Sequence, residues 1–372
     1  MNYDSIISFL AVLIVILFLL FSVFLLSVKT EKKLSNQLLA AFLIITAIDI
    51  SAFFYYQIIE LPLALEMLRN KISLFKNPLL FLYILSVIYS NFKLKGKHLI
   101  HLLPWLITIL VLLPNFFLAD EAAKIAFFRN YDNNSEVQFL SYFGDVLSFT
   151  YLCAEIYYIV RYRKLLLENY TDKNAFKNYA WLKQLSILLF IGQAITLVKG
   201  YIRVNYSGNA IDIIRTVTLL FGVFFICWLF LKAVNSPKLF KGVDVDLKTS
   251  KEIKSTEDKD KIHPQILLLK DFMVDKKPYL NPSLTIRTLA SALKMNSRDL
   301  SVLINQNLNQ HFFDFVNEYR IEEAKNILRN PSKKEYTVLE ILYEVGFNSK
   351  SSFNTAFKKY TGKTPTQFRK SS

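Results

Sequence analysis

The sequence predicts an all-α protein with seven membrane-spanning helices in residues 1–234, a charged linker in 235–262, and two helix-turn-helix units in 263–372. Three observations lead to this fold class. Hydrophobic residues make up 53% of the 372-residue chain, although its formal net charge is +15. Apolar runs of the length that crosses a bilayer recur throughout the first part of the chain. The last part shows short amphipathic segments bounded by capping and turn residues.

The overall composition argues against a soluble enzyme. The mean hydropathy of +0.29 is high for a soluble chain with so many cations, and it indicates apolar blocks joined to basic ones. Cys153 and Cys227 both lie inside apolar runs, so neither a disulfide framework nor a thiolate metal site is predicted. The histidines are scattered, and the sequence has no recognisable nucleophile–base pair or phosphate-binding glycine loop. We therefore expect no catalytic site and no cofactor.

The first apolar run, 5–28, is predicted to be a membrane span. A signal peptide would need a basic start and a shorter apolar core. Six further spans are predicted at about 34–56, 72–89, 98–118, 140–160, 181–198 and 211–234. Lys76 and Pro78 interrupt the start of the third span. Tyrosine and tryptophan residues near several span ends are typical of the membrane interface.

The loops between these spans predict the orientation of the chain. Lysine and arginine number three in 29–33, three in 93–97 and five in 161–180, whereas each alternate loop carries two. Cytoplasmic loops are enriched in these residues. The amino terminus is therefore expected outside, and the carboxy terminus in the cytoplasm, for a multi-pass protein of the cytoplasmic (inner) membrane.

Several polar side chains interrupt the spans, mostly toward the predicted outer face. Charges at membrane depth are costly, and they usually pair within a bundle or line a cavity. One interpretation is an outward-facing pocket for a small ligand, with Asp49, Asp145, Gln193 and Arg215 as its candidate ligand-binding residues. The other, which we favour, is that Asp49 or Asp145 pairs with Arg215 and fixes the bundle.

The segment 235–262 carries seven lysines and six acidic residues and few apolar ones. Such a segment cannot bury a core, and it is predicted to be a solvated linker or an exposed helix.

The segment 337–369 has the pattern of a helix-turn-helix unit. Thr337 and Glu340 form a capping-box start, and Gly346 permits a left-handed turn residue. Asn348 or Ser349 can cap a second helix over 350–360, and Gly362 is its predicted stop. The second helix of such a unit can lie in the major groove of DNA. Phe353 and Phe357 fall four residues apart on its opposite face and are expected in the core.

An earlier segment repeats this pattern. Residues 289–297 match 341–349 at an offset of 52, and Asn309 falls where Gly362 stands in the second copy. Asn296-x-x-Asp299 is the predicted cap of a first recognition helix over 297–307. Between the copies, 312–328 is predicted to form one amphipathic helix that holds the two units at a fixed separation.

The run EVGFNSKSSFNTAFKKYTGKTPTQFR closely resembles the second helix-turn-helix of the AraC/XylS family of bacterial transcription regulators. The resemblance extends over most of 263–372, including KPYLNPSLTIRTLA. The wider chain looks like the membrane-anchored members of that family that carry a multi-span sensor. The resemblance implies sequence-specific binding to double-stranded promoter DNA, with RNA polymerase as a further partner.

The exposed positions of the two recognition helices are the predicted DNA contacts: Ser297, Arg298, Ser301, Val302, Asn305 and Gln306 in the first, and Lys350, Ser351, Asn354, Thr355, Lys358 and Lys359 in the second. The first helix departs from the family because only Arg298 in it is basic. From residue 337 onward the chain has six basic and two acidic residues. We therefore expect the second unit to supply more of the phosphate contact, while the first reads bases, with Val302 against a thymine methyl group.

Two function classes follow from the architecture. In the first, the chain is a one-component regulator whose bundle, in contact with the lipid bilayer, senses a small-molecule or membrane-borne ligand and controls the DNA-binding units, with a homodimer as the expected assembly. In the second, the bundle is a transporter and the cytoplasmic part reports its occupancy. A passive DNA tether is a third reading.

Overall fold

The computed structural model describes residues 3–30, 33–89, 91–171, 173–205, 209–236 and 259–371. These residues form helices and turns and contain no strand, apart from an isolated β-bridge, so the predicted all-α class is confirmed for them. Most of the predicted linker, 235–262, lies outside the described residues. The chain divides into two compact units, of which the first holds 1–159 and 181–246 and the second holds 160–180 and 247–372.

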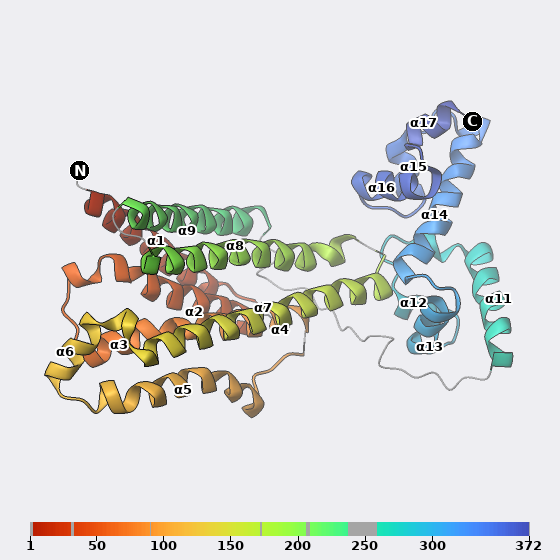
Figure 1. Ribbon diagram of the computed structural model, residues 1–372. Coiled ribbons are helices and arrows are strands. Elements are labelled where there is room, and N and C mark those ends of the chain that lie inside the picture. Colours follow the sequence, from red (N-terminus) through yellow and green to blue (C-terminus); the bar gives the residue numbers. More distant parts are fainter. Residues whose placement is uncertain are drawn as a thin grey trace. The chain divides into compact units, whose positions relative to one another are not determined.

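The first unit is a bundle of helices (Figure 1). Its helices are α1 (Tyr3–Ser27), α2 (Lys33–Ile50), α3 (Leu63–Lys71), α4 (Lys76–Ile88), α5 (Leu103–Leu112), α6 (Glu121–Arg129), α7 (Ser135–Asn169), α8 (Lys177–Asn205) and α9 (Asn209–Asn235), and the last part of α7 and the first part of α8 belong to the second unit. Among the described residues, seven helical segments are long and apolar enough to cross a membrane. Their number and order match the seven spans that the sequence predicts.

Several of these segments, among them the third and the fifth, are longer than predicted. The third begins at Leu63 and not near residue 72, because a 3-10 turn at Ile72–Phe75 connects α3 to α4. Pro78 lies in the first turn of α4, where a proline does not remove a helical hydrogen bond. The fifth segment is α7, which runs for 35 residues as one continuous helix.

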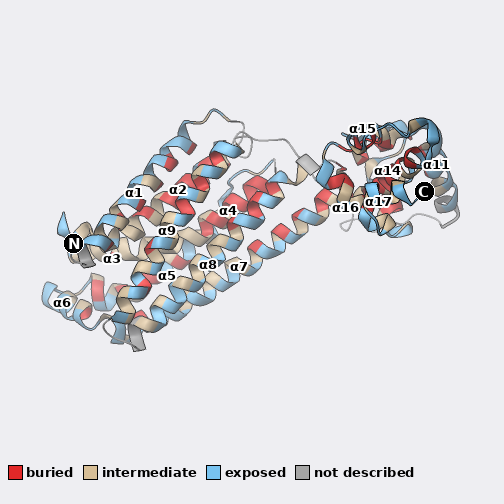
Figure 2. Ribbon diagram, turned by 90° about the horizontal axis from the view of Figure 1, so that it is seen from above, coloured by how far each residue is buried: buried red, intermediate tan, exposed pale blue. Residues whose placement is uncertain are grey.

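Large apolar side chains cover the outside of the first unit. Phe9 is 60% exposed, Leu110 66% and Val146 66%, whereas side chains between the helices, such as Phe21 and Leu43, are fully buried. Figure 2 shows the exposed and buried faces alternating along these helices. Apolar patches of this extent are rare on proteins that face water on all sides.

The second unit contains two apolar cores joined by one helix. Its helices are α11 (Lys259–Lys276), α12 (Ile286–Ala292), α13 (Ser297–Val302), α14 (Phe312–Arg329), α15 (Val338–Glu344), α16 (Lys350–Thr361) and α17 (Pro365–Lys370). Phe312 and Val316 of α14 pack into the core around α12 and α13, and Ala324 and Leu328 pack into the core around α15 and α16. Figure 1 shows α14 running from one group of helices to the other.

A buried arginine fastens the two halves of this unit. Arg320 of α14 is 1% exposed, and it donates from Nε to the carbonyl oxygen of Tyr279 at 2.7 Å and from Nη2 to that of Asn281 at 2.8 Å. Its guanidinium also lies over the Phe347 ring, 5.5 Å from the centroid. Gly346 stands beside the same turn with a φ of +88°, and a Cβ there would lie 2.5 Å from the Tyr279 oxygen. Only glycine fits this position without a backbone shift.

Candidate nucleic-acid interface

The second helix-turn-helix unit begins at the predicted capping box. The hydroxyl of Thr337 accepts the backbone N–H of Glu340 at 3.1 Å, and the Glu340 carboxylate accepts the backbone N–H of Thr337 at 2.7 Å. These bonds satisfy two of the amide donors that a helix start leaves free. Because the carboxylate form accepts them, the backbone N–H and hydroxyl of Thr337 hold the pKa of Glu340 below its usual range.

The second recognition helix is α16, and its ends match the sequence prediction. Ser349, one of the two candidates, caps the helix by accepting the backbone N–H of Ser352. Gly362 ends it in the left-handed conformation with a φ of +72°. Phe353 and Phe357 are fully buried in the core, as predicted. The inner face of α16 is therefore fixed, and its outer face is presented to solvent.

The outer face of α16 carries most of the predicted DNA contacts of this unit. Lys350, Ser351, Thr355 and Lys358 are exposed, and Asn354 is half-buried. Lys359 is exposed as well, but its Nζ lies 2.6 Å from a carboxylate oxygen of Asp314 on α14. Lys358 is therefore better suited than Lys359 to meet a phosphate, because the charge of Lys359 is already partly neutralised.

The first helix-turn-helix unit is built on the same plan as the second, with different residues. Thr285 and Thr288 form its capping box, and Asn296 caps α13 by accepting the backbone N–H of Arg298 at 3.0 Å. After α13 the chain continues as a π turn over Leu303–Asn307, so the predicted helix over 297–307 is confirmed. Asn309 adopts the predicted left-handed conformation, with a φ of +52°.

The outer face of this first recognition helix is only partly exposed. Arg298 and Gln306 are exposed, but Ser301 is only 8% exposed and Val302 only 6%. Ser297 and Asn305 are half-buried, and Asn305 donates from Nδ2 to the carbonyl oxygen of Ser301 at 2.8 Å. Helical spacing predicts that Ser301 and Val302 face solvent, and the structure differs from that expectation.

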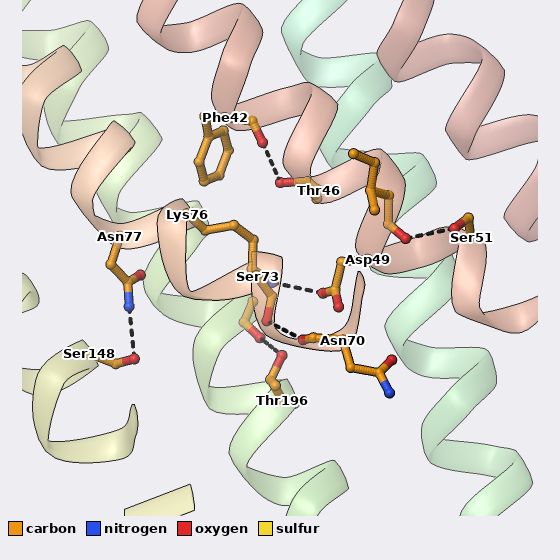
Figure 3. Close-up of polar contacts among 12 residues, drawn as sticks. Phe42, Thr46, Asp49, Ser51, Asn70, Ser73, Lys76, Asn77, Ser148 and Thr196 are labelled. Carbon is orange, nitrogen blue, oxygen red and sulfur yellow. Dashed lines mark hydrogen bonds and ion pairs between the residues drawn. The ribbon is translucent and has the colours of Figure 1, made fainter. Parts of the chain in front are cut away.

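The candidate ligand-binding residues of the helical bundle do not gather at one place. Asp49 pairs with Lys76 of α4 at 2.8 Å (Figure 3), and Arg215 lies 3.5 Å from Asp212, one turn away on the same helix. The predicted pairing of Asp49 or Asp145 with Arg215 is therefore replaced by pairs between nearer neighbours. Asp145 and Arg215 are exposed, and Gln193 is half-buried.

Asp49 has further cations in its neighbourhood. Arg69 donates from Nη1 to the carbonyl oxygen of Ile48 at 3.4 Å, and Nζ of Lys199 lies 5.8 Å from the centroid of the Phe53 ring. The Arg69 guanidinium also lies over the Tyr55 ring at 4.1 Å, and Tyr55 donates its hydroxyl to Glu66 at 2.7 Å. Among the described residues, no group of histidine, cysteine and acidic side chains is arranged to hold a metal ion.

Sequence reasoning did not single out Arg320, although a signal was present. Arg320 falls four residues after Val316 and four before Ala324, so it lies on the apolar stripe of the linking helix. A charged residue on such a stripe is costly to bury unless hydrogen bonds compensate, so it marks a structural role.

Comparison with known proteins agrees with this geometry. A family described as "Helix-turn-helix domain" matches residues 289–371. The C-terminal region is an AraC-type helix-turn-helix domain. The uncharacterized transcriptional regulatory protein YesN of Bacillus subtilis (strain 168) is 35% identical over 92 residues, which are 24% of this chain and 24% of that protein. The Msm operon regulatory protein of Streptococcus mutans serotype c is 30% identical over 24% of this chain and 31% of its own length.

Among solved structures, the AraC-type domain is similar to the C-terminal domain of the two-component response regulator YesN from Fusobacterium nucleatum subsp. nucleatum. The two are 30% identical, the match covers 28% of this chain and 98% of that one, and the TM-score is 0.25. The present chain spans about a quarter to a third of the length of the curated relatives named above.

Proposed function

We propose that this protein is a membrane-bound one-component transcription regulator. Its AraC-type domain binds promoter DNA sequence-specifically, and its bundle holds that domain at the cytoplasmic membrane and responds to a small-molecule or membrane-borne cue. The observation that carries the DNA-binding part is the outer face of α16, where Lys350, Ser351, Thr355 and Lys358 stand exposed on a helix whose inner face is fixed in a core. Cationic and hydrogen-bonding side chains on one rigid face suit phosphates and base edges.

The charge of the domain supports this proposal. Residues 263–372 carry 17 basic and 10 acidic groups, a net charge of +7. A positive domain is attracted to DNA over several ångströms, and each phosphate contact makes the affinity dependent on salt. RNA polymerase and a second copy of the chain are further partners that fit a promoter-bound regulator.

Two observations support the membrane placement. The first is the set of seven apolar helical segments with exposed apolar side chains. The second concerns orientation. The loop 161–180 is one of the three lysine- and arginine-rich loops that we assign to the cytoplasm, and it packs in the same compact unit as the AraC-type domain. Loop charge and packing therefore favour the same side of the membrane for both.

For the cue we propose the outer part of the bundle, where Asp49, Lys76 and their cationic neighbours form a polar cluster in an otherwise apolar bundle. Asp145, Gln193 and Arg215 remain candidate ligand contacts. Exchange of Asp49 and Arg215 for alanine should remove the response to the cue and leave DNA binding intact. Vesicles that instead show substrate flux would favour a transporter.

The DNA-binding proposal is tested by selection from a pool of random duplexes with the full-length protein in lipid nanodiscs. We expect enrichment of one motif. A variant with Lys350→Glu and Lys358→Glu should enrich none, and the matched control Lys334→Glu, on an exposed loop residue outside the recognition helices, should enrich the same motif as the wild type. The absence of any enriched motif from the wild type would contradict the proposal.

A further inference from the structure

The connector, which we define as residues 160–180, joins α7 to α8 and packs in the same unit as the AraC-type domain. Its first part, 160–169, is the end of α7, and a 3-10 turn at Lys173–Phe176 leads into α8. The connector is thus continuous with two bundle helices in sequence and shares a compact unit with the DNA-binding helices.

Backbone and side-chain contacts join the connector to the start of the first helix-turn-helix unit. Tyr170 forms an isolated antiparallel β-bridge with Thr285, the residue that caps α12. Thr171 is 5% exposed and donates its hydroxyl to the carbonyl oxygen of Leu284 at 2.8 Å. These contacts lie directly before α12, the first helix of the first helix-turn-helix unit.

The connector also reaches α14 of the domain. The Phe176 ring packs edge to face on Phe313, with the ring centroids 5.7 Å apart. Arg320, which fastens the two halves of the domain, has its Nη2 3.5 Å from the Thr171 hydroxyl. The connector therefore contacts both the first helix-turn-helix unit and α14, the helix that links the two helix-turn-helix units.

The same segment lies beside the first recognition helix. Lys164 and Glu168 line a cavity of about 510 Å³ together with Asn305 and Gln306 at the end of that helix. Glu168 is only 1% exposed. Its carboxylate lies 3.8 Å from Nζ of Lys164, so this ion pair holds both side chains beside the end of the recognition helix.

The burial of Val302 is consistent with this cover. Val302 is 6% exposed, yet it is not among the residues of the first apolar core, which takes Leu300, Leu303 and Ile304 from the same helix. A side chain that reads base edges must reach into the groove. In this arrangement Val302 and Ser301 are not accessible to a duplex.

We propose that the connector is an autoinhibitory element that covers the first recognition helix, so that connector docking and DNA binding by this helix exclude each other. This inference rests on the DNA-binding function proposed above. Helix α7 has 35 residues and is about 52 Å long, which exceeds the roughly 30 Å of bilayer hydrocarbon. A cue that shifts α7 within the membrane moves the connector directly and releases the helix.

A reversible disulfide tests this proposal in the full-length protein. Residues paired across an antiparallel bridge have Cα atoms about 4.5–5.5 Å apart, which is within the span of a disulfide. The variant carries Tyr170→Cys and Thr285→Cys in a background with Cys153→Ala and Cys227→Ala, which removes both native thiols. Reduced protein in nanodiscs first selects its duplex from a random pool, and that duplex is the probe for both redox states.

Oxidation is expected to form the crosslink and to weaken binding to the selected duplex by about tenfold or more, with full recovery on reduction. Because each state is compared on one variant, the loss of the Thr285 cap cancels. The control is the same background with Tyr170→Cys alone, whose affinity oxidation should leave unchanged. No crosslink, or a crosslinked protein that binds the duplex equally or more tightly, would overturn the proposal. If the reduced protein selects no duplex, the proposed function itself fails, and the inference with it.

A second variant loosens the connector. Thr171→Val with Phe176→Ala removes the hydrogen bond to Leu284 and the ring contact with Phe313. We expect tighter binding of the selected duplex than by the wild type, without a change in the motif that is selected. Unchanged or weaker binding would contradict an inhibitory role for these contacts.

Discussion

The two helix-turn-helix units follow one plan, but they differ in what their recognition helices expose. In the second unit α16 presents Lys350, Thr355 and Lys358 to solvent, whereas in the first Ser301 and Val302 are buried. Both inner faces are packed in apolar cores. Helical spacing predicts which side of a recognition helix faces the core, but it does not predict how far the residues of the other side are exposed.

The turn residues of the two units differ in the same instructive way. Gly346 has a φ of +88°, and Lys294 stands at the equivalent position of the first unit with a φ of +56°. At Gly346 a Cβ would meet backbone oxygens, whereas the first unit accepts a side chain there. Equivalent turns thus carry different constraints, because at Gly346 the backbone oxygens of Tyr279 and Leu280 lie where a Cβ would stand.

The largest expected effect comes from Arg320, which contacts residues of both halves of the AraC-type domain. Arg320→Met removes the hydrogen bonds from a charged donor to the carbonyl oxygens of Tyr279 and Asn281, and we expect it to lower the free energy of unfolding by about 3 kcal/mol or more. Urea denaturation of the full-length protein, followed by the fluorescence of a label at the domain, measures the effect. The exposed Lys334→Met is the control and should change little; equal effects of the two substitutions would contradict the role of Arg320.

The two left-handed glycines of the second unit provide a sharper comparison. Gly346→Ala should destabilise the domain by about 2–3 kcal/mol, because backbone strain adds to a clash with the Tyr279 oxygen. A Cβ at Gly362 meets no atom within 4 Å, so Gly362→Ala should cost only the strain of about 1 kcal/mol. The same denaturation experiment compares the two, and a larger loss for Gly362→Ala would refute this account of the turn.

The lysines at the end of α16 separate phosphate contact from internal pairing. Lys358→Ala should reduce the salt dependence of DNA binding by about one phosphate contact. Lys359→Ala should reduce it less, because Lys359 already pairs with Asp314. Binding measured across a series of salt concentrations tests both variants, and an unchanged slope for Lys358→Ala would remove Lys358 from the phosphate contacts.

The smallest expected effect is a pH dependence of stability, which the capping box with Glu340 should show and the one with Thr288 should not. Glu340 has a lowered pKa in the folded protein, so its contribution to stability is fully present above the pKa of an unfolded glutamate, about 4.3, and is lost as the pH falls through the lower folded value. The first unit has the neutral Thr288 at this position. Thermal unfolding between about pH 3 and 6 should therefore show a small acid loss that Glu340→Gln abolishes; the same acid loss in that variant would contradict the assignment.

Local signals in the sequence predicted much of both helix-turn-helix units. The ends of both recognition helices, the cap at Thr337, the stop at Gly362 and the left-handed Asn309 depend on residues within one or two turns, and all are found. Such features follow from backbone hydrogen bonding and steric preference, which act over short distances.

Contacts between distant segments were not predictable in the same way. The hydrogen bonds of Arg320 and the pairing of Asp49 with Lys76 each bring together elements far apart in the sequence, and the burial of Val302 was not predicted either. Helical spacing places a residue on a face but does not say what packs against that face. For Arg320 the polar residue on an apolar stripe was a usable signal, whereas the pairing of Asp49 had several candidate partners.

The most direct test of the central claim is a genome-wide map of DNA occupancy by the full-length protein in living cells, made beside a variant with Lys350→Glu and Lys358→Glu. Membrane fractionation of the same cells establishes that both proteins stay with the membrane. We predict peaks that share one motif for the wild type and no such peaks for the variant. A membrane-bound wild-type protein without sequence-specific peaks would contradict a membrane-held DNA-binding regulator.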